Sequence, residues 1–190
     1  MSKRSSNLVA FVVMIACSVV APLASGQNQF PTFEVDPTWP SLPNDWVLGQ
    51  VASVTVDPRD HVWVLHRPGT VEEERRANAA PPVLEFMTDG TFVQAWGGAS
   101  EGYDWPANEH GIHADADGNI WVGGNSAQPV SDDKLRSVTN GGDLLLQIGG
   151  PGRSSGNTDT DNLRRPAESF VYGDEVFVAD GYGNRRVIVL

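Results

Sequence analysis

The sequence predicts an all-β protein, and within that class a β-propeller built from four-stranded blades. Two observations carry this prediction. Short apolar runs alternate with turn-forming Gly, Asp, Asn and Pro, and little helical periodicity is visible. The runs also recur with a period of roughly 50 residues and four runs per period, which is typical of propellers. The expected strands are residues 51–57, 61–66, 83–86, 92–97, 111–115, 120–124, 135–138, 144–149, 169–172, 176–180 and 186–190.

The internal repeat defines the blades. The triplets VWV at 62–64, IWV at 120–122 and VFV at 176–178 each follow a polar turn and lead into a loop. The runs FVQAWG and LLLQIG form a second recurring unit. The expected strands make two blades and three strands of a third, whereas a closed propeller needs about four blades or more. We therefore expect an incomplete ring, with an uncovered apolar face at each end.

The N-terminus has the pattern of a secretory signal peptide at residues 1–26. Lys3 and Arg4 precede an apolar run at 8–24, and small residues follow at 24–26. A membrane anchor is the alternative, and the sequence around Cys17 also loosely resembles a lipoprotein cleavage box. Cleavage after Gly26 would give a secreted or periplasmic protein without cysteine.

The remaining chain divides into an extended N-terminal segment, residues 27–48, and a partial propeller, residues 49–190. The 24 acidic residues outnumber the 13 Lys and Arg residues. This balance argues against nucleic acid and against an anionic membrane surface as partners, because both attract basic patches. No membrane contact is expected after signal cleavage.

Three polar residues are expected on one face of the propeller. Antiparallel pairing places the start of a blade's first strand beside the end of its second. His110 precedes a first strand, Arg67 follows a second strand, and Tyr182 follows another second strand. The spacing therefore predicts that these side chains share the face around the central channel.

Three segments carry a resemblance to a known family: GQVASVTVDPRDHVWVLHRP at 49–68, EHGIHADADGNIWVGG at 109–124 and VFVADGYGNRRVIV at 176–189. They resemble NHL-repeat propellers, and more closely the peptidyl-α-hydroxyglycine α-amidating lyases, especially secreted bacterial members. The resemblance implies a propeller of NHL-type blades, of which about three of six are present here.

The resemblance also implies roles for individual residues. His110 matches a zinc ligand, and Val54 and Ile112 match residues whose main-chain carbonyls bind calcium. Arg67 matches an arginine that holds the substrate carboxylate, and Tyr182 matches the catalytic tyrosine. The family's other zinc histidines lie in later blades, so the site is incomplete in this chain.

Each assignment has a structural alternative. His110 could be a turn histidine, Arg67 a solvated loop residue, and Tyr182 a residue that packs a turn. His113 faces the opposite side of the strand from Ile112 and is expected to pack or to support the site. Residues 157–162 lack the glycine of an EF-hand and are expected to form a solvated loop, with weak calcium binding as the alternative.

The family's reaction is the zinc-dependent cleavage of a peptidyl-α-hydroxyglycine to a peptide amide and glyoxylate. The expected partner is a small peptide or carbinolamide substrate, together with the missing blades or a self-associated copy. Two alternatives stay open: a non-enzymatic NHL propeller that binds a peptide or glycan, and a calcium-dependent, lactonase-like propeller hydrolase.

Overall fold

The computed structural model describes residues 30–99, 102–128 and 131–190. The signal-peptide prediction therefore lies outside the described residues. The chain divides into two compact units, Met1–Val35 and Asp36–Leu190, and the described residues of the first unit are exposed. Within the described part, no helix has the length and apolar character to cross a bilayer.

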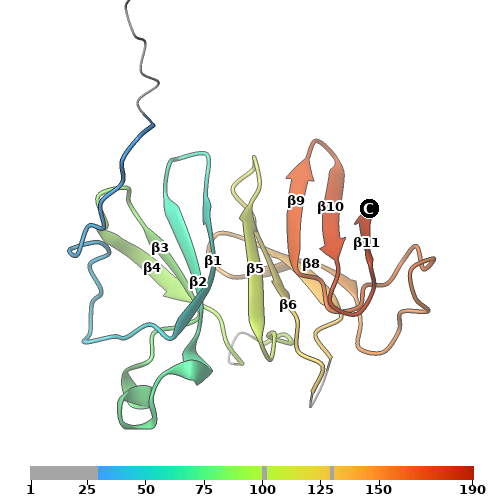
Figure 1. The fold of residues 1–190 in the computed structure, drawn as a ribbon, viewed down its shortest axis with the longest axis horizontal. Coiled ribbons are helices and arrows are strands. Elements are labelled where there is room, and N and C mark those ends of the chain that lie inside the picture. Colours follow the sequence, from blue (N-terminus) through green and yellow to red (C-terminus); the bar gives the residue numbers. More distant parts are fainter. Residues whose placement is uncertain (1–29, 100–101, 129–130) are drawn as a thin grey trace, which may run out of the picture. The chain divides into compact units, whose positions relative to one another are not determined.

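The described residues form eleven β-strands and two short 3-10 helices (Figure 1). Every expected strand is present, with bounds that differ by two residues or fewer. The helices η1 (Pro68–Thr70) and η2 (Glu73–Asn78) lie in a stretch without strand signals. The strands are β1 (Gln50–Val56), β2 (Val62–Arg67), β3 (Val83–Phe86), β4 (Phe92–Trp96), β5 (Glu109–Ala114), β6 (Ile120–Gly124), β7 (Lys134–Val138), β8 (Leu144–Gly149), β9 (Glu168–Tyr172), β10 (Glu175–Asp180) and β11 (Arg186–Val189).

The strands make three antiparallel sheets in sequence order. The first two sheets have the orders β1-β2-β3-β4 and β5-β6-β7-β8, and the third has the order β11-β10-β9. The first strands of the sheets lie side by side, because β5 packs against both β1 and β9 (Figure 1). This arrangement confirms the all-β class and the partial propeller of four-stranded blades.

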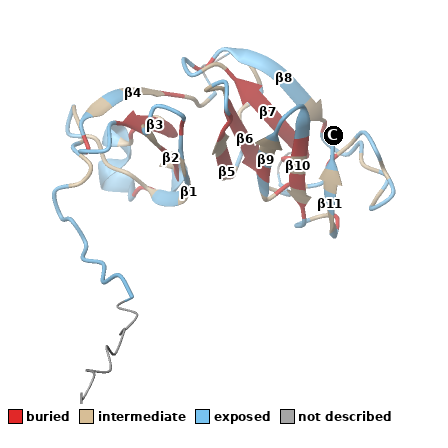
Figure 2. Ribbon diagram, turned by 90° about the horizontal axis from the view of Figure 1, so that it is seen from above, coloured by how far each residue is buried: buried red, intermediate tan, exposed pale blue. Residues whose placement is uncertain are grey.

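Apolar clusters hold neighbouring sheets together. Buried side chains of the first and second sheets form one cluster, and those of the second and third sheets form another. Buried residues are coloured red on the ribbon in Figure 2, for example along β3, β5, β7 and β10. Burial of such side chains contributes about 1.5–3 kcal/mol each. The first cluster includes Trp63, Leu65, Val83, Ile112, Ile120 and Val122, and the second includes Trp121, Leu135, Leu163, Val176 and Val178.

The outer face of the first sheet is covered by the chain's own N-terminal segment. Trp39 packs against Phe86 and Trp46 against Phe92, with ring centroids 5.7 Å apart in each pair. Leu42 and Leu48 pack against the same cluster. The expectation of two uncovered faces was therefore wrong for this end, because aromatic residues outside the repeat replace a neighbouring blade.

The face of the third sheet that points away from the second sheet is exposed. Phe170 pairs with Phe177 and Phe177 with Val189, so these side chains lie on one face. The relative exposure of Phe170 is 55% and that of Tyr172 is 72%. The third sheet thus presents an apolar surface where the other two sheets contact a neighbour.

A repeated turn sets the geometry between the first two strands of each complete blade. The Asp57 carboxylate accepts hydrogen bonds from the backbone N–H of His61 and from the Trp63 indole at 3.0 and 3.1 Å. The Asp115 carboxylate accepts from the backbone N–H of Asn119 and from the Trp121 indole, both at 2.9 Å. The repeat seen in the sequence is therefore a repeated hydrogen-bonded turn with a buried tryptophan.

Candidate functional site

The structure brings His110 and Tyr182 into direct contact. His110 Nε2 lies 2.9 Å from the Tyr182 hydroxyl, and the two ring centroids are 5.0 Å apart. His110 lies inside β5, at an irregularity in its pairing with β6, rather than before the strand as expected. Tyr182 follows β10, as the sequence predicted.

The hydrogen bonds of His110 fix its tautomer. His110 Nδ1 lies 2.8 Å from the carbonyl oxygen of Ala167, which can only accept a hydrogen bond. Nδ1 therefore carries the proton, and in the neutral imidazole Nε2 accepts from the Tyr182 hydroxyl. Histidine ligands of metals usually donate their other ring N–H to such an acceptor, so this arrangement fits a metal ligand.

Gly111 allows β9 to approach β5 closely enough for that contact. A Cβ atom at Gly111 would lie 2.6 Å from the Ala167 carbonyl oxygen and 2.7 Å from Glu168 Oε1. Both distances are well below van der Waals contact. The Glu168 carboxylate also accepts a hydrogen bond from the Ser53 hydroxyl of β1 at 3.2 Å. The glycine beside His110 is therefore a packing requirement where the first strands meet.

Arg67 reaches the same edge of the second sheet. It is the last residue of β2, and its Nε donates to the carbonyl oxygen of Glu109 at 2.8 Å. That carbonyl precedes His110 directly in the chain. The predicted common location of Arg67, His110 and Tyr182 is therefore present in the structure.

Glu109 is a buried acidic residue at this edge of the sheet. Its side chain is buried, and the carboxylate accepts from the Trp105 indole at 2.9 Å. Burial raises the pKa of the Glu109 carboxyl, and the Asp132 carboxylate adds to that shift. Sequence reasoning missed this residue because a glutamate at the start of a strand carries no burial signal.

Arg165 is a second residue that sequence reasoning missed. Its guanidinium carbon lies 5.8 Å from the centroid of the Tyr182 ring. Its Nε donates to the carbonyl oxygen of Asn125 at 2.9 Å, and its backbone N–H donates to Asp133 at 3.0 Å. These bonds place a cation beside the tyrosine.

The two predicted calcium ligands occupy equivalent positions on neighbouring strands. Val54 of β1 pairs with Val64, and Ile112 of β5 pairs with Val122, at the same place in each blade. Carbonyl oxygens are ligands that calcium accepts, so the register is compatible with the predicted role. Val54 is 59% exposed, whereas Ile112 is buried.

His113 points to the other side of β5. Its ring lies against Phe170 with centroids 5.0 Å apart, and burial lowers the pKa of the imidazole. Its Nε2 is buried and has no hydrogen-bond partner in the described part of the chain. This placement accords with a packing role.

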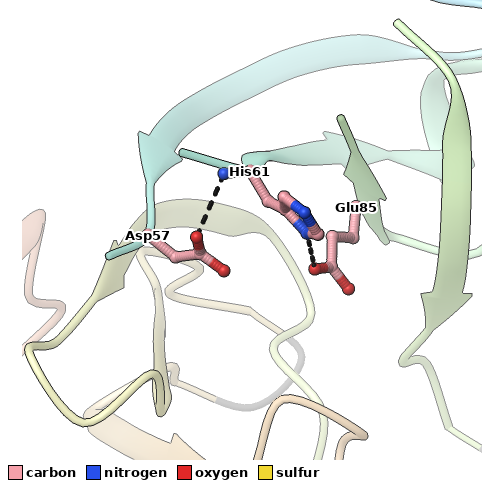
Figure 3. A group of neighbouring side chains, drawn as sticks. All are labelled: Asp57, His61 and Glu85. Atoms are coloured by element: carbon pink, nitrogen blue, oxygen red, sulfur yellow. Dashed lines mark hydrogen bonds and ion pairs between the residues drawn. The ribbon is translucent and has the colours of Figure 1, made fainter. Parts of the chain in front are cut away.

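Asp57, His61 and Glu85 form a separate group whose side-chain atoms lie close enough to surround an ion (Figure 3). His61 Nδ1 lies 2.6 Å from Glu85 Oε1. Arg59 Nη2 lies 2.6 Å from Asp57 Oδ2 and 2.7 Å from Glu85 Oε1. The guanidinium therefore already supplies the positive charge between the carboxylates, so we interpret the group as a structural network.

The loop at residues 157–162 is organised by a guanidinium in a similar way. Arg186 donates to the carbonyl oxygens of Asn157, Asp159 and Asn162. Backbone N–H groups hold the pKa of the Asp159 carboxyl far below its usual range. Three backbone carbonyls of this loop therefore accept hydrogen bonds from an arginine of the same chain.

No protein-family model matches the sequence. The chain is similar to NHL repeat-containing protein 3 of Mus musculus, with 26% identity over 172 residues that cover 87% of this chain and 45% of that protein. NHL repeat-containing protein 3 of Homo sapiens is 26% identical over 164 residues, covering 83% of this chain and 43% of that protein. The chain spans less than half the length of these relatives, and the likeness supports an NHL-repeat family.

Proposed function

We propose that this chain forms part of the active site of a zinc-dependent lyase that cleaves peptidyl-α-hydroxyglycine to a peptide amide and glyoxylate. The observation that carries the proposal is the pair of His110 and Tyr182. His110 Nδ1 contacts a backbone carbonyl oxygen, as in many metal-ligating histidines, and the Tyr182 hydroxyl lies 2.9 Å from Nε2.

The reaction requires a proton transfer that Tyr182 is placed to perform. The substrate hydroxyl loses a proton as the bond between carbon and nitrogen breaks, the carbon becomes the aldehyde of glyoxylate, and the departing nitrogen gains a proton. The Tyr182 oxygen lies beside His110 and can exchange a proton with the substrate hydroxyl. Zinc held by His110 Nε2, in place of the hydrogen bond from Tyr182, would polarise that hydroxyl oxygen and lower its pKa.

Arg67 is the group proposed to orient the substrate. A guanidinium can bind a carboxylate with two parallel hydrogen bonds, and this fixes the direction of the glycine-derived end. Arg67 Nε is held by the Glu109 carbonyl, which directs the rest of the guanidinium. Calcium on the carbonyls of Val54 and Ile112 would tie neighbouring first strands together.

A binding module without catalysis is the second candidate. The relatives named above are NHL repeat-containing proteins whose names state no activity. The His110–Tyr182 contact would then be a structural hydrogen bond. The lactonase-like alternative needs a site of carboxylate and amide ligands, and the acidic group around Glu85 is already engaged by Arg59.

Zinc content and glyoxylate release test the proposal on the full-length protein. We expect His110→Ala to lower bound zinc about tenfold or more, since a tetrahedral site loses one of its protein ligands. His61→Ala is the matched control, because His61 belongs to the network with Glu85. Unchanged zinc in His110→Ala, by elemental analysis, would return His110 to a structural role. Absence of glyoxylate release by the zinc-loaded wild type would favour the binding module.

A further inference from the structure

A cavity of about 720 Å³ opens beside Arg67. Its volume lies within the range of small-molecule sites, about 300–1,000 Å³. The walls come from the end of β2 and helix η1, the segment before β3, the end of β4, and the segment before β5. Most of the lining is apolar, including Trp46, Pro68, Ala79, Pro81, Pro82 and Trp105.

The charged groups of the cavity are Arg67 and Glu109. The Glu109 side chain is buried, and its Oε1 accepts a hydrogen bond from the Trp105 indole at 2.9 Å. Arg67 uses Nε for the Glu109 carbonyl and makes a long contact from Nη1 to Gln50 at 3.4 Å. Its Nη2 has no hydrogen-bond partner among the described residues. The cavity therefore combines an aromatic and proline-lined wall with one available cationic donor.

We infer that this cavity binds the aromatic side chain preceding the C-terminal glycine unit of a peptide, while the carboxylate of that unit pairs with Arg67. The inference rests on the proposed function for the identity of the glycine unit. Charge complementarity selects a ligand with one carboxylate, because Arg67 is the accessible charge. The rings of Trp46 and Trp105 and the flat faces of Pro81 and Pro82 favour an aromatic group over a small or charged one.

Gly69 offers a way to block the cavity without disturbing the fold. It lines the cavity, and a Cβ atom built on it would meet no atom within 4 Å. Gly69→Leu therefore adds apolar volume at the wall without a clash. Gly141→Leu is the matched control, since its Cβ would make an ordinary contact of 3.8 Å with Thr139 in the turn before β8.

Binding of two unreactive dipeptides to the full-length protein tests the inference by calorimetry. The probes are N-acetyl-phenylalanyl-glycine and N-acetyl-alanyl-glycine, which lack the hydroxyl that the lyase needs. We expect the phenylalanyl probe to bind about tenfold more tightly, which is the effect of burying an aromatic side chain in place of a methyl group. Gly69→Leu should remove that preference, and Arg67→Gln should weaken both probes about tenfold through the lost charged hydrogen bond. Gly141→Leu should bind like the wild type.

Equal binding of the two probes, or a phenylalanyl preference that survives Gly69→Leu, would overturn the inference. Failure of the proposed function has a different signature. In that case the phenylalanyl probe still binds preferentially, while the zinc-loaded protein releases no glyoxylate from either α-hydroxyglycine analogue. If glyoxylate is released equally well from the phenylalanyl and alanyl analogues and the probes bind alike, the lyase stands and the cavity assignment fails.

Discussion

The Tyr182 hydroxyl lies 2.9 Å from His110 Nε2, although 72 positions separate the two residues in the sequence. The contact exists because β9 passes close to β5 and the loop after β10 returns to the same edge. Backbone hydrogen bonds from Tyr182 and Gly183 to the carbonyls of Arg165 and Arg164 hold that loop in place. The packing of the second and third sheets thus determines the pair.

Tyr182→Phe tests whether the tyrosine has a chemical role. The variant keeps the ring but removes the group that exchanges a proton, so we expect kcat for glyoxylate release by the full-length protein to fall by about 10²–10⁴. Zinc content should be unchanged, because the phenol is not needed to hold the metal in the proposed site. A kcat close to that of the wild type would show that the hydroxyl only orients His110.

Gly111→Ala tests the packing that positions His110. The new Cβ would clash with the Ala167 carbonyl, so β9 must move away and the His110 Nδ1 bond must lengthen. We expect the free energy of unfolding to fall by about 1–3 kcal/mol in urea titrations. Gly123→Ala is the control, because Gly123 pairs with Gly111 while its Cβ would meet Leu135 at an ordinary 3.6 Å. Equal losses in the two variants would contradict the packing argument.

His66 predicts a loss of stability in mild acid. The side chain is fully buried, its Nδ1 accepts from the Gly49 N–H at 3.0 Å, and its Nε2 donates to the Pro81 carbonyl. Burial lowers the pKa of His66 below the ordinary 6.5. As pH falls below that ordinary value, the unfolded chain takes up a proton that the folded chain does not, so the free energy of unfolding decreases with falling pH.

The comparison of wild type with His66→Gln isolates this effect. Glutamine can supply an uncharged acceptor and donor in place of the imidazole. Between about pH 7.5 and about pH 5.5, we expect the wild type to lose about 1 kcal/mol more stability than the variant. The measurement is chemical denaturation at both pH values. Parallel pH profiles for the two proteins would show that His66 takes up a proton equally readily in the folded and the unfolded chain.

Arg136 is a buried charge whose removal should stabilise the fold. The residue is fully buried on β7, and none of its three side-chain nitrogens has a hydrogen-bond partner in the described chain. Burial lowers the pKa of this guanidinium. We expect Arg136→Met to raise the free energy of unfolding by about 1–3 kcal/mol, because an unsatisfied polar group is replaced by an apolar one of similar length.

Lys134→Met on the same strand provides the control for Arg136. The Lys134 ammonium is paired with the Asp104 carboxylate, so its removal should lower stability rather than raise it. Thermal unfolding of both variants checks the prediction. Destabilisation in Arg136→Met would mean that the guanidinium is satisfied in solution.

The strands were predictable because their signals are local. β3 and β6 coincide with the predicted ranges, since apolar runs there are bounded by turn residues. The start of β5 was not predicted, because Glu109 and His110 carry no strand preference and are placed by the neighbouring sheets. The same reason applies to Trp39 and Trp46, whose aromatic character indicates burial but does not identify the face they cover.

The site was predictable in its location but not in its contacts. Antiparallel pairing and the repeat placed Arg67, His110 and Tyr182 at one edge. The Ala167 carbonyl that contacts His110 Nδ1 lies 57 positions away in the sequence. Every residue has a backbone carbonyl, so residue types do not show which one a histidine will contact. Arg165 likewise has no neighbouring motif that signals its approach to Tyr182.

The exposed face of the third sheet predicts the behaviour of residues 27–190 expressed alone. The equivalent faces of the first two sheets are covered by a neighbouring sheet, whereas Phe170, Tyr172 and Val187 are 55%, 72% and 68% exposed. The face of the first sheet at the other end is covered by Trp39 and Trp46, so association through that face is not expected. We expect sedimentation to show concentration-dependent association.

Phe170→Glu should reduce that association, because a charge resists burial in an apolar contact. Glu175→Gln, at the start of the central strand β10 and paired with Tyr172, is a control that keeps every apolar side chain of the face and introduces no charge. We expect no glyoxylate release from residues 27–190 with added zinc, because the described residues place a single histidine beside Tyr182. A monodisperse monomer with zinc-dependent turnover would contradict both the open face and the incomplete site. A closed oligomer with turnover would instead show that copies of this chain complete the site for one another.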